Sequence, residues 1–143
     1  MSKLIKEEII HFKSTSLLPL SGEESELVNE GKYGKAVCQF LETELKGLGF
    51  KVIRYVAEDW GWWIEVENTI KSIELGVYCN GVVNGVAEYA VNLDTRKSEF
   101  FKLASMKKVS RVDAMLELRA AIHKILEASM DIEVVSVSED FPF

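Results

Sequence analysis

The residues best suited to chemistry lie in one short stretch, Ala57 to Asn68, with the sequence AEDWGWWIEVEN. It holds all three tryptophans of the chain, and Glu58 and Asp59 directly precede them. Indole offers a large apolar face and one N–H donor, and tryptophan is enriched where proteins bind partners. Carboxylates beside an indole favour a cationic or basic partner. The stretch therefore predicts either a binding site or a turn between two strands.

As a turn, residues 58–61 form a four-residue hairpin loop. Asp59 then accepts backbone hydrogen bonds at its start, and Gly61 supplies a positive φ. Side chains alternate between the two faces of a strand, so Trp62 enters the core and Trp63 lies on the opposite face. This interpretation explains the stretch without any function.

As a binding site, the same stretch uses Trp60 and Trp63 for apolar surface and Glu58, Asp59 or Glu65 for charge. A tryptophan beside carboxylates on an exposed sheet face suits a basic partner. General acid–base catalysis needs a second, correctly placed group, and the stretch supplies none that can be identified. No catalytic residue is therefore assigned.

A second group of candidates consists of charges that fall on apolar helix stripes. At about 100° per residue, Glu44 lies about 20° from Tyr33, in the middle of one stripe. Arg119 lies within the stripe of a second helix, and His123 lies toward its edge. Three interpretations stay open. In the first, Glu44 and Arg119 form a buried pair. In the second, each charged group reaches solvent at the edge of the stripe while its methylenes cover apolar surface. In the third, the three residues line an acid–base pocket.

Motifs for metals and cofactors are missing from the sequence. The two histidines, His11 and His123, do not form H-x-x-x-H, and Cys38 and Cys79 are far apart. A zinc site is therefore not expected. The chain also lacks a phosphate-binding glycine loop and a G-x-S-x-G elbow. We expect no metal and no cofactor, and we expect both cysteines to act as small core residues.

The composition bounds the class of protein. The chain has 143 residues and a formal charge of −6, which predicts one domain over 1–143 and disfavours nucleic acids and anionic membranes as partners. The first residues lack the apolar core of a signal peptide, and no window is apolar enough to span a bilayer. We expect a cytoplasmic protein with reduced thiols.

The elements that must position these residues follow from periodicity. We predict an α+β fold: a largely antiparallel sheet of five to six strands with two long amphipathic helices on one face. Polar connections cover 14–32 and 94–109. Turns are expected at Asn80-Gly81 and Asn84-Gly85, and Ser110 is expected to cap the second helix. The expected strands are 4–13, 51–57, 62–67, 73–80, 86–93 and 132–137, and the expected helices are 33–48 and 111–129.

Part of the chain resembles a family of small bacterial proteins that have no established activity. The likeness covers roughly residues 29–67 and rests on Tyr33-Gly-Lys-Ala in the first helix and on Glu58-Asp-Trp-Gly-Trp after a strand. Trp63, which follows, is not part of that pattern. The resemblance implies an α+β fold and supplies no catalytic residues.

Three functions remain as expectations. The favoured one is a non-enzymatic module that sequesters a basic protein partner, as bacterial immunity proteins or antitoxins do; this comparison is an analogy. The second is a small-molecule enzyme or sensor with Glu44, Arg119 and His123 in a cleft between helices and sheet. The third is a structural protein whose surplus apolar surface forms a homodimer.

Overall fold

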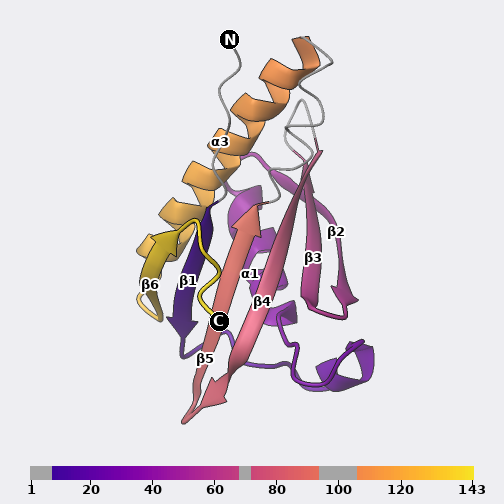
Figure 1. The fold of residues 1–143 in the computed structure, drawn as a ribbon, viewed down its shortest axis with the longest axis vertical. Helices are drawn as coiled ribbons and strands as arrows, with labels where there is room; N and C mark the ends of the chain where they lie inside the picture. Colours follow the sequence, from indigo (N-terminus) through magenta and orange to yellow (C-terminus); the bar gives the residue numbers. More distant parts are fainter. Residues whose placement is uncertain (1–7, 68–71, 94–105) are drawn as a thin grey trace.

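A computed structural model describes residues 8–67, 72–93 and 106–143, with side chains from Asp113 onward in the last range. One sheet and two helices make up most of this part (Figure 1). The elements in chain order are β1 Ile9–Ser14, the 3₁₀ helix η1 Glu23–Glu26, α1 Lys35–Lys46, β2 Lys51–Glu58, β3 Gly61–Glu67, β4 Ser72–Val83, β5 Val86–Leu93, α3 Met106–Ala128 and β6 Ile132–Ser138.

The sheet has six strands in the order β2-β3-β4-β5-β1-β6, and every neighbouring pair is antiparallel. Strands β2 to β5 form a meander, because connections this short can join only antiparallel neighbours. Strand β1 lies between β5 and β6, a position that the sequence did not reveal. The predicted α+β class, with a largely antiparallel sheet and two helices, is confirmed.

Both helices pack on one face of the sheet, which we call the inner face. Strand alternation sends apolar side chains inward, where they meet the apolar stripes of α1 and α3. The first-helix residues Val37, Leu41 and Leu45 are fully buried there, as is Leu118 of α3. Neither α1 nor α3 covers the opposite, outer face of the sheet, and the segment after β6 lies in front of it in Figure 1.

Several predicted boundaries were wrong. Strand β4 continues through Asn80-Gly81, where its pairing with β5 is irregular, and the turn falls only at Asn84-Gly85. Asn84 and Gly85 have φ of 52° and 77°, the pair of positive values that an Asn-Gly hairpin turn requires. Helix α3 begins at Met106, so Ser110 is not its N-cap.

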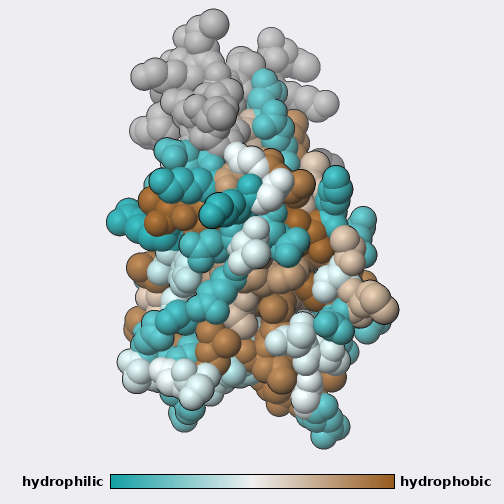
Figure 2. Space-filling model, turned by 180° about the vertical axis from the view of Figure 1, so that it is seen from behind, coloured by the Kyte–Doolittle hydropathy of each residue, from teal (hydrophilic) through white to brown (hydrophobic). Residues whose placement is uncertain are grey.

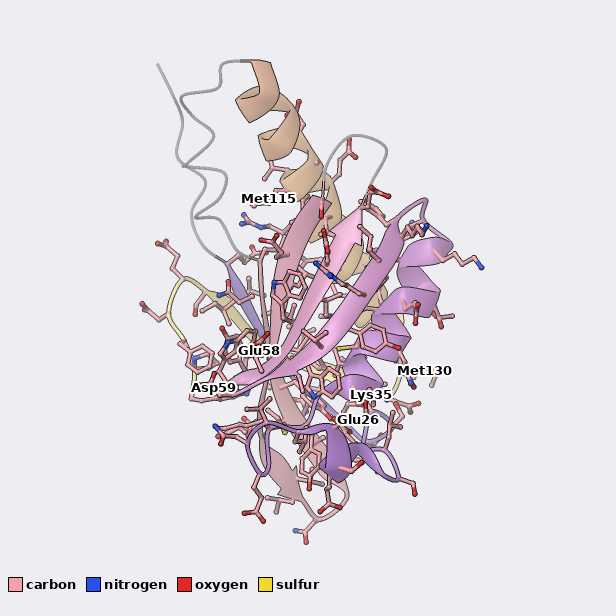
Figure 3. The ribbon with its side chains drawn as sticks, turned by 90° about the vertical axis from the view of Figure 1, so that its right-hand side faces the viewer. Glu26, Lys35, Glu58, Asp59, Met115 and Met130 are labelled. Carbon is pink, nitrogen blue, oxygen red and sulfur yellow. The ribbon has the colours of Figure 1, made fainter. Side chains whose placement is uncertain are left out.

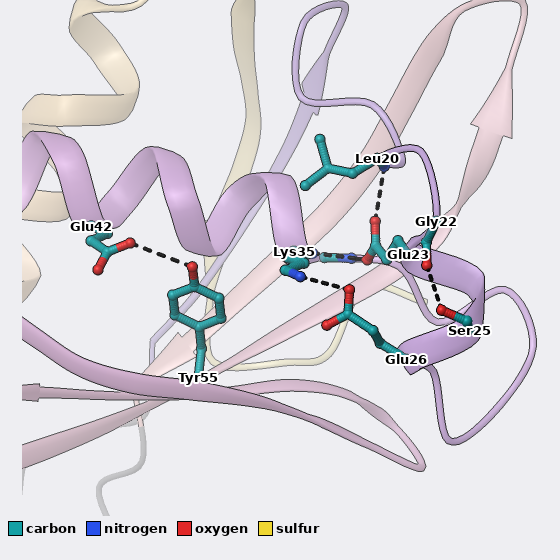
Figure 4. Close-up of polar contacts among 9 residues, drawn as sticks. Leu20, Gly22, Glu23, Ser25, Glu26, Lys35, Glu42 and Tyr55 are labelled. Atoms are coloured by element: carbon teal, nitrogen blue, oxygen red, sulfur yellow. Dashed lines mark hydrogen bonds and ion pairs between the residues drawn. The ribbon is translucent and has the colours of Figure 1, made fainter.

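The long connection before α1 is organised by the buried carboxylate of Glu23, which the sequence gave no reason to single out. Its Oε2 accepts hydrogen bonds from the backbone N–H groups of Gly34 (2.9 Å) and Lys35 (3.0 Å), and its Oε1 accepts one from Leu20 (3.0 Å), as Figure 4 illustrates. A negative charge at a helix N-terminus satisfies unpaired N–H groups and the helix dipole. Glu23 therefore caps α1 from a distance and closes the loop.

The helix side of the molecule is shown in Figure 2, where apolar residues lie between polar ones. A groove of about 450 Å³ opens there between the end of α1 and helix α3, with Leu48, Phe50 and Ala121 among its lining residues. In the described ranges, neither helix combines the length and apolarity needed to cross a membrane.

Candidate functional site

The hairpin that carries the aromatic stretch is tighter than expected. Glu58 and Gly61 already pair as strand residues, so the loop consists of Asp59 and Trp60 alone. The side-chain amide of Asn29 donates a hydrogen bond of 2.6 Å to the backbone carbonyl of Asp59. No hydrogen bond to the exposed Asp59 carboxylate exists within the described residues, so its expected capping role was wrong. Figure 3 shows Glu58 and Asp59 at the hairpin tip, away from α1.

Gly61 permits this geometry, although for a reason beyond the turn. Its φ is 154°, and a Cβ there would lie 2.2 Å from the carbonyl oxygen of Val77 on β4. Only glycine allows β3 to lie this close to its neighbour. The next residue, Trp62, enters the core with 2% of its surface exposed, as predicted. A Cβ on Gly34 would lie 2.8 Å from the Trp62 ring, so the residue before α1 must also be small.

Trp63 lies on the outer face, where the sequence placed it, and it already has a cation. The guanidinium carbon of Arg54 lies 5.4 Å from the centre of the Trp63 ring. The Arg54 Nε donates to Glu65 at 3.0 Å, and the Ser72 hydroxyl donates to Glu65 at 2.6 Å. Trp63 and Glu65 are thus brought together as predicted, but an internal arginine takes the place that was expected for a partner.

Trp60 has different neighbours. Its ring lies over the backbone of β4, since a Cβ on Gly76 would be 3.2 Å from the indole. It stacks on Tyr78 with ring centres 4.9 Å apart and an interplanar angle of 33°. Its flanking acids, Glu58 and Asp59, form no ion pair within the described residues. Trp60 is therefore an aromatic surface with negative charge beside it, and no cation from the described residues stacks on it.

Further rings continue from Trp60 across the outer face. Phe141 meets Tyr78 edge-on at 4.8 Å, Phe143 meets Phe141 at 5.3 Å, and Phe143 meets the His11 imidazole edge-on at 5.3 Å. We call these five residues, Trp60, Tyr78, Phe141, Phe143 and His11, the outer aromatic row. Aromatic pairs favour such offset and edge-to-face contacts. Hairpin, central strands and chain end thus meet on one surface.

The far end of the row is polar. The His11 Nε2 and Glu88 Oε2 atoms are 2.5 Å apart, and the Asn80 amide donates to Glu88 Oε1 at 3.1 Å. Partial burial alone would raise the pKa of Glu88, but the hydrogen bonds from Asn80 and His11, with the charges of His11 and Lys13, outweigh it and lower the pKa. Glu88 is thus held as a carboxylate, and the acidic character of this face is preserved.

The helix charges do not form the predicted constellation. Glu44 is exposed on α1 and makes no ion pair with Arg119 in the described part of the chain. Instead, Arg119 and His123 converge on Glu8, just before β1: Glu8 Oε1 lies 2.7 Å from His123 Nε2 and 3.4 Å from Arg119 Nε. The helical wheel misplaced Glu44 because it was referred to Tyr33, which lies before α1, whereas the buried stripe of the helix is displaced toward Cys38 and runs along Val37, Leu41 and Leu45. The partner of Arg119 could not be found by spacing within a helix.

Enclosed space offers little support for a catalytic pocket. Two hollows are described: the groove between the end of α1 and α3, and a smaller one of about 210 Å³ at the end of β1 and the start of β6. Neither is lined by Glu44, Arg119 or His123. Both cysteines are buried, and burial raises the pKa of the Cys38 and Cys79 thiols. A thiol held neutral in this way is a poor nucleophile. They serve as core residues.

Sequence reasoning missed four members of the outer aromatic row: Tyr78, Phe141, Phe143 and His11. Tyr78 carried a detectable signal, since strand alternation alone places it on the face opposite Val77. The phenylalanines lie in a polar segment after the last strand, and no local pattern predicts where such a segment packs.

Comparison of the chain with protein-family models, with curated proteins and with solved structures finds no match. Its function must therefore be inferred from the surface just described.

Proposed function

We propose that this protein is a non-enzymatic module that binds and sequesters a basic protein partner through the outer face of its sheet. The acidic side chains Glu58, Asp59, Glu88 and Asp140 surround or adjoin an aromatic surface there. The chain's net charge of −6 has the same sign and would speed the approach of a cationic partner.

The observation that carries the proposal is the position of Trp60. An indole at a hairpin tip, lying on Gly76 and Tyr78 and flanked by two carboxylates, is partly exposed and does not contribute to the inner core. Interfaces concentrate binding energy in such aromatic anchors, with polar groups at the rim. Trp63 supports the proposal less, because Arg54 already covers it.

The predicted alternative of an enzyme or sensor using Glu44, Arg119 and His123 lacks a comparable observation. Glu44 is exposed and separate from the other two. Homodimer formation is a different outcome of the same exposed surface, and light scattering of the purified chain distinguishes it from binding of a foreign partner.

The test uses fluorescein-labelled dodecapeptides that share one aromatic composition and differ in net charge from about −4 to +4, with affinity measured by anisotropy. We expect affinity to rise with positive charge and to fall with added salt, because rim ion pairs are screened. The double variant Glu58→Gln/Asp59→Asn removes two charges beside Trp60 and should bind the cationic peptides about tenfold more weakly, which corresponds to about 1.4 kcal/mol.

The matched control removes the same charge elsewhere. Glu44→Gln/Glu127→Gln neutralises one exposed carboxylate on each helix, on the other side of the sheet. If both double variants weaken binding equally, only net charge matters, and the outer face has no special role. If Trp60→Ala leaves the affinity unchanged, the proposed anchor is wrong.

A further inference from the structure

The segment after β6 turns back over the outer face of its own sheet. The Ser138 hydroxyl accepts a hydrogen bond from the Asp140 N–H at 3.2 Å and donates one to the Asp140 carbonyl at 2.9 Å. This local turn reverses the chain at the end of the last strand, and Pro142 restricts the backbone that follows. Residues 139–143, which we call the return segment, are thereby directed onto the outer aromatic row.

Two phenylalanines make the contact. Phe141 lies against Tyr78 of β4, and Phe143 lies against His11 of β1, two strands away. Between these strands runs β5, where Ala90 pairs with both His11 and Tyr78. Ala90 lies on the outer face and still has no exposed surface. Phe-Pro-Phe therefore spans one cross-strand row whose middle residue is small enough to admit rings above it.

The two phenylalanines of the return segment are nevertheless only partly buried. Phe141 is 46% exposed and Phe143 is 38% exposed, against 0% for Phe12 in the inner core. The first two residues of the segment, Glu139 and Asp140, are acidic, as are Glu58 and Asp59 beside Trp60 at one end of the row. The segment thus brings further negative charge to a face that already carries Glu58 and Asp59. The aromatic complementarity of the segment is good and its charge complementarity is poor.

We infer that the return segment is an internal competitor for the proposed binding surface, and that the partner displaces it with a segment carrying two aromatic side chains two positions apart and basic flanking residues. This inference rests on the proposed function and names the chemistry of the partner. A basic Phe-x-Phe segment keeps the ring contacts with Tyr78 and His11. Its basic flanking residues add attraction to the carboxylates of Glu58 and Asp59.

The test uses three amidated, acetylated peptides added to the full chain: SEDFPF, which copies residues 138–143, SKKFPF and SKKSPS. The released variant is Phe141→Ser/Phe143→Ser. Its matched control is Val135→Ser/Val137→Ser, which removes two apolar side chains of similar exposure, 45% and 44%, at the same spacing on β6. Amide chemical shifts of Gly76 and Ala90 report binding at the outer face, and calorimetry supplies the affinities.

We expect the released variant to bind SKKFPF at least tenfold more tightly than the parent and the control do, with shifts at Gly76 and Ala90. Equal affinities of released variant and parent would overturn the inference, as would equal binding of SKKFPF and SKKSPS. The proposed function fails separately: if SEDFPF binds as tightly as SKKFPF, the aromatic site stands and the preference for a basic partner does not.

Discussion

Trp62 and Trp63 are neighbours in the chain and lie on opposite faces of the same strand, in surroundings that share almost nothing. Trp62 is buried among apolar side chains beneath α1, with the Tyr55 ring centre 6.2 Å away. Position 34 is a glycine, and a side chain there would clash with the Trp62 ring. Trp63, like Trp60, lies on a face where rings alternate with carboxylates and remain partly exposed. The inner face holds the buried core, whereas the outer face keeps partly exposed rings and is the face on which we propose binding.

The largest expected difference is between the two tryptophans themselves. Trp62→Ala should lower the free energy of unfolding by about 3–5 kcal/mol, because it leaves a cavity in a closed core. Trp63→Ala should cost about 1 kcal/mol or less, since its position is partly exposed. Urea titration of both variants measures this. Similar losses would show that the outer face is as structural as the inner one.

The next largest effect is expected for Glu23, the buried carboxylate that caps α1. Glu23→Ala should cost about 3 kcal/mol, because backbone N–H groups of Leu20, Gly34 and Lys35 lose their acceptor and buried donors without partners are expensive. The adjacent, exposed Glu24 is the control, and Glu24→Ala should change stability by at most about 0.5 kcal/mol. Both variants are measured by thermal and urea unfolding, and equal losses of stability for Glu23→Ala and Glu24→Ala would contradict the capping role.

The two faces should also respond at opposite ends of the pH scale. On the inner face, burial raises the pKa of the Cys38 thiol and the Tyr89 phenol. Their neutral forms are favoured in the fold, so this stability is fully present below the unfolded pKa values of about 8.5 and 10 and is lost as pH rises above them. Cys38→Ala should flatten the loss of stability measured between pH 8.5 and 10.

On the outer face the sign is reversed. The pKa of Glu88 is lowered, because hydrogen bonds from Asn80 and His11 and nearby positive charge outweigh its partial burial. Its contribution is present above the unfolded pKa of about 4.3 and is lost as pH falls below it. Glu88→Gln should reduce the acid slope of the urea midpoint and leave the alkaline slope unchanged. An altered alkaline slope would show that the faces are coupled.

The smallest effects belong to the hairpin tip. Asp59→Asn should be neutral within about 0.5 kcal/mol, since its exposed carboxylate accepts no hydrogen bond within the described residues. Trp60→Ala should cost about 1 kcal/mol, mainly through the lost contact with Tyr78. Losses of about 2 kcal/mol or more in both would mean that the turn is structural, and they would remove the main argument for a binding role.

Short-range patterns were enough to predict much of the fold. Helical spacing identified the helix around Val37 and Leu41, and alternation identified the strand that holds Trp62 and Trp63. The Asn84-Gly85 turn followed from its dipeptide. Boundaries were less certain: Ser110 resembled a cap, yet the helix continues through it from Met106. A capping pattern describes a local preference, which a longer helix can override.

The candidate surface could be predicted only in part. Glu58, Asp59, Trp60, Trp63 and Glu65 were identified from composition and alternation, while the return segment and His11 were not. Glu23 and Glu8 were missed for the same reason. The partners of Glu23 at the start of α1 lie 11 and 12 residues away, and His123 lies 115 residues from Glu8. Contacts between residues so far apart in the chain leave no periodic pattern in the sequence.

The sequence by itself determined which residues share a face on β3, β4 and β5, because side-chain direction follows from backbone geometry one residue at a time. Only the tertiary structure decided which outward residues meet. It brings Trp60 from a hairpin, Tyr78 from a central strand, His11 from β1 and Phe141 from the return segment onto one surface. Such meetings depend on strand order and on chain reversal, and both result from the packing of the whole chain.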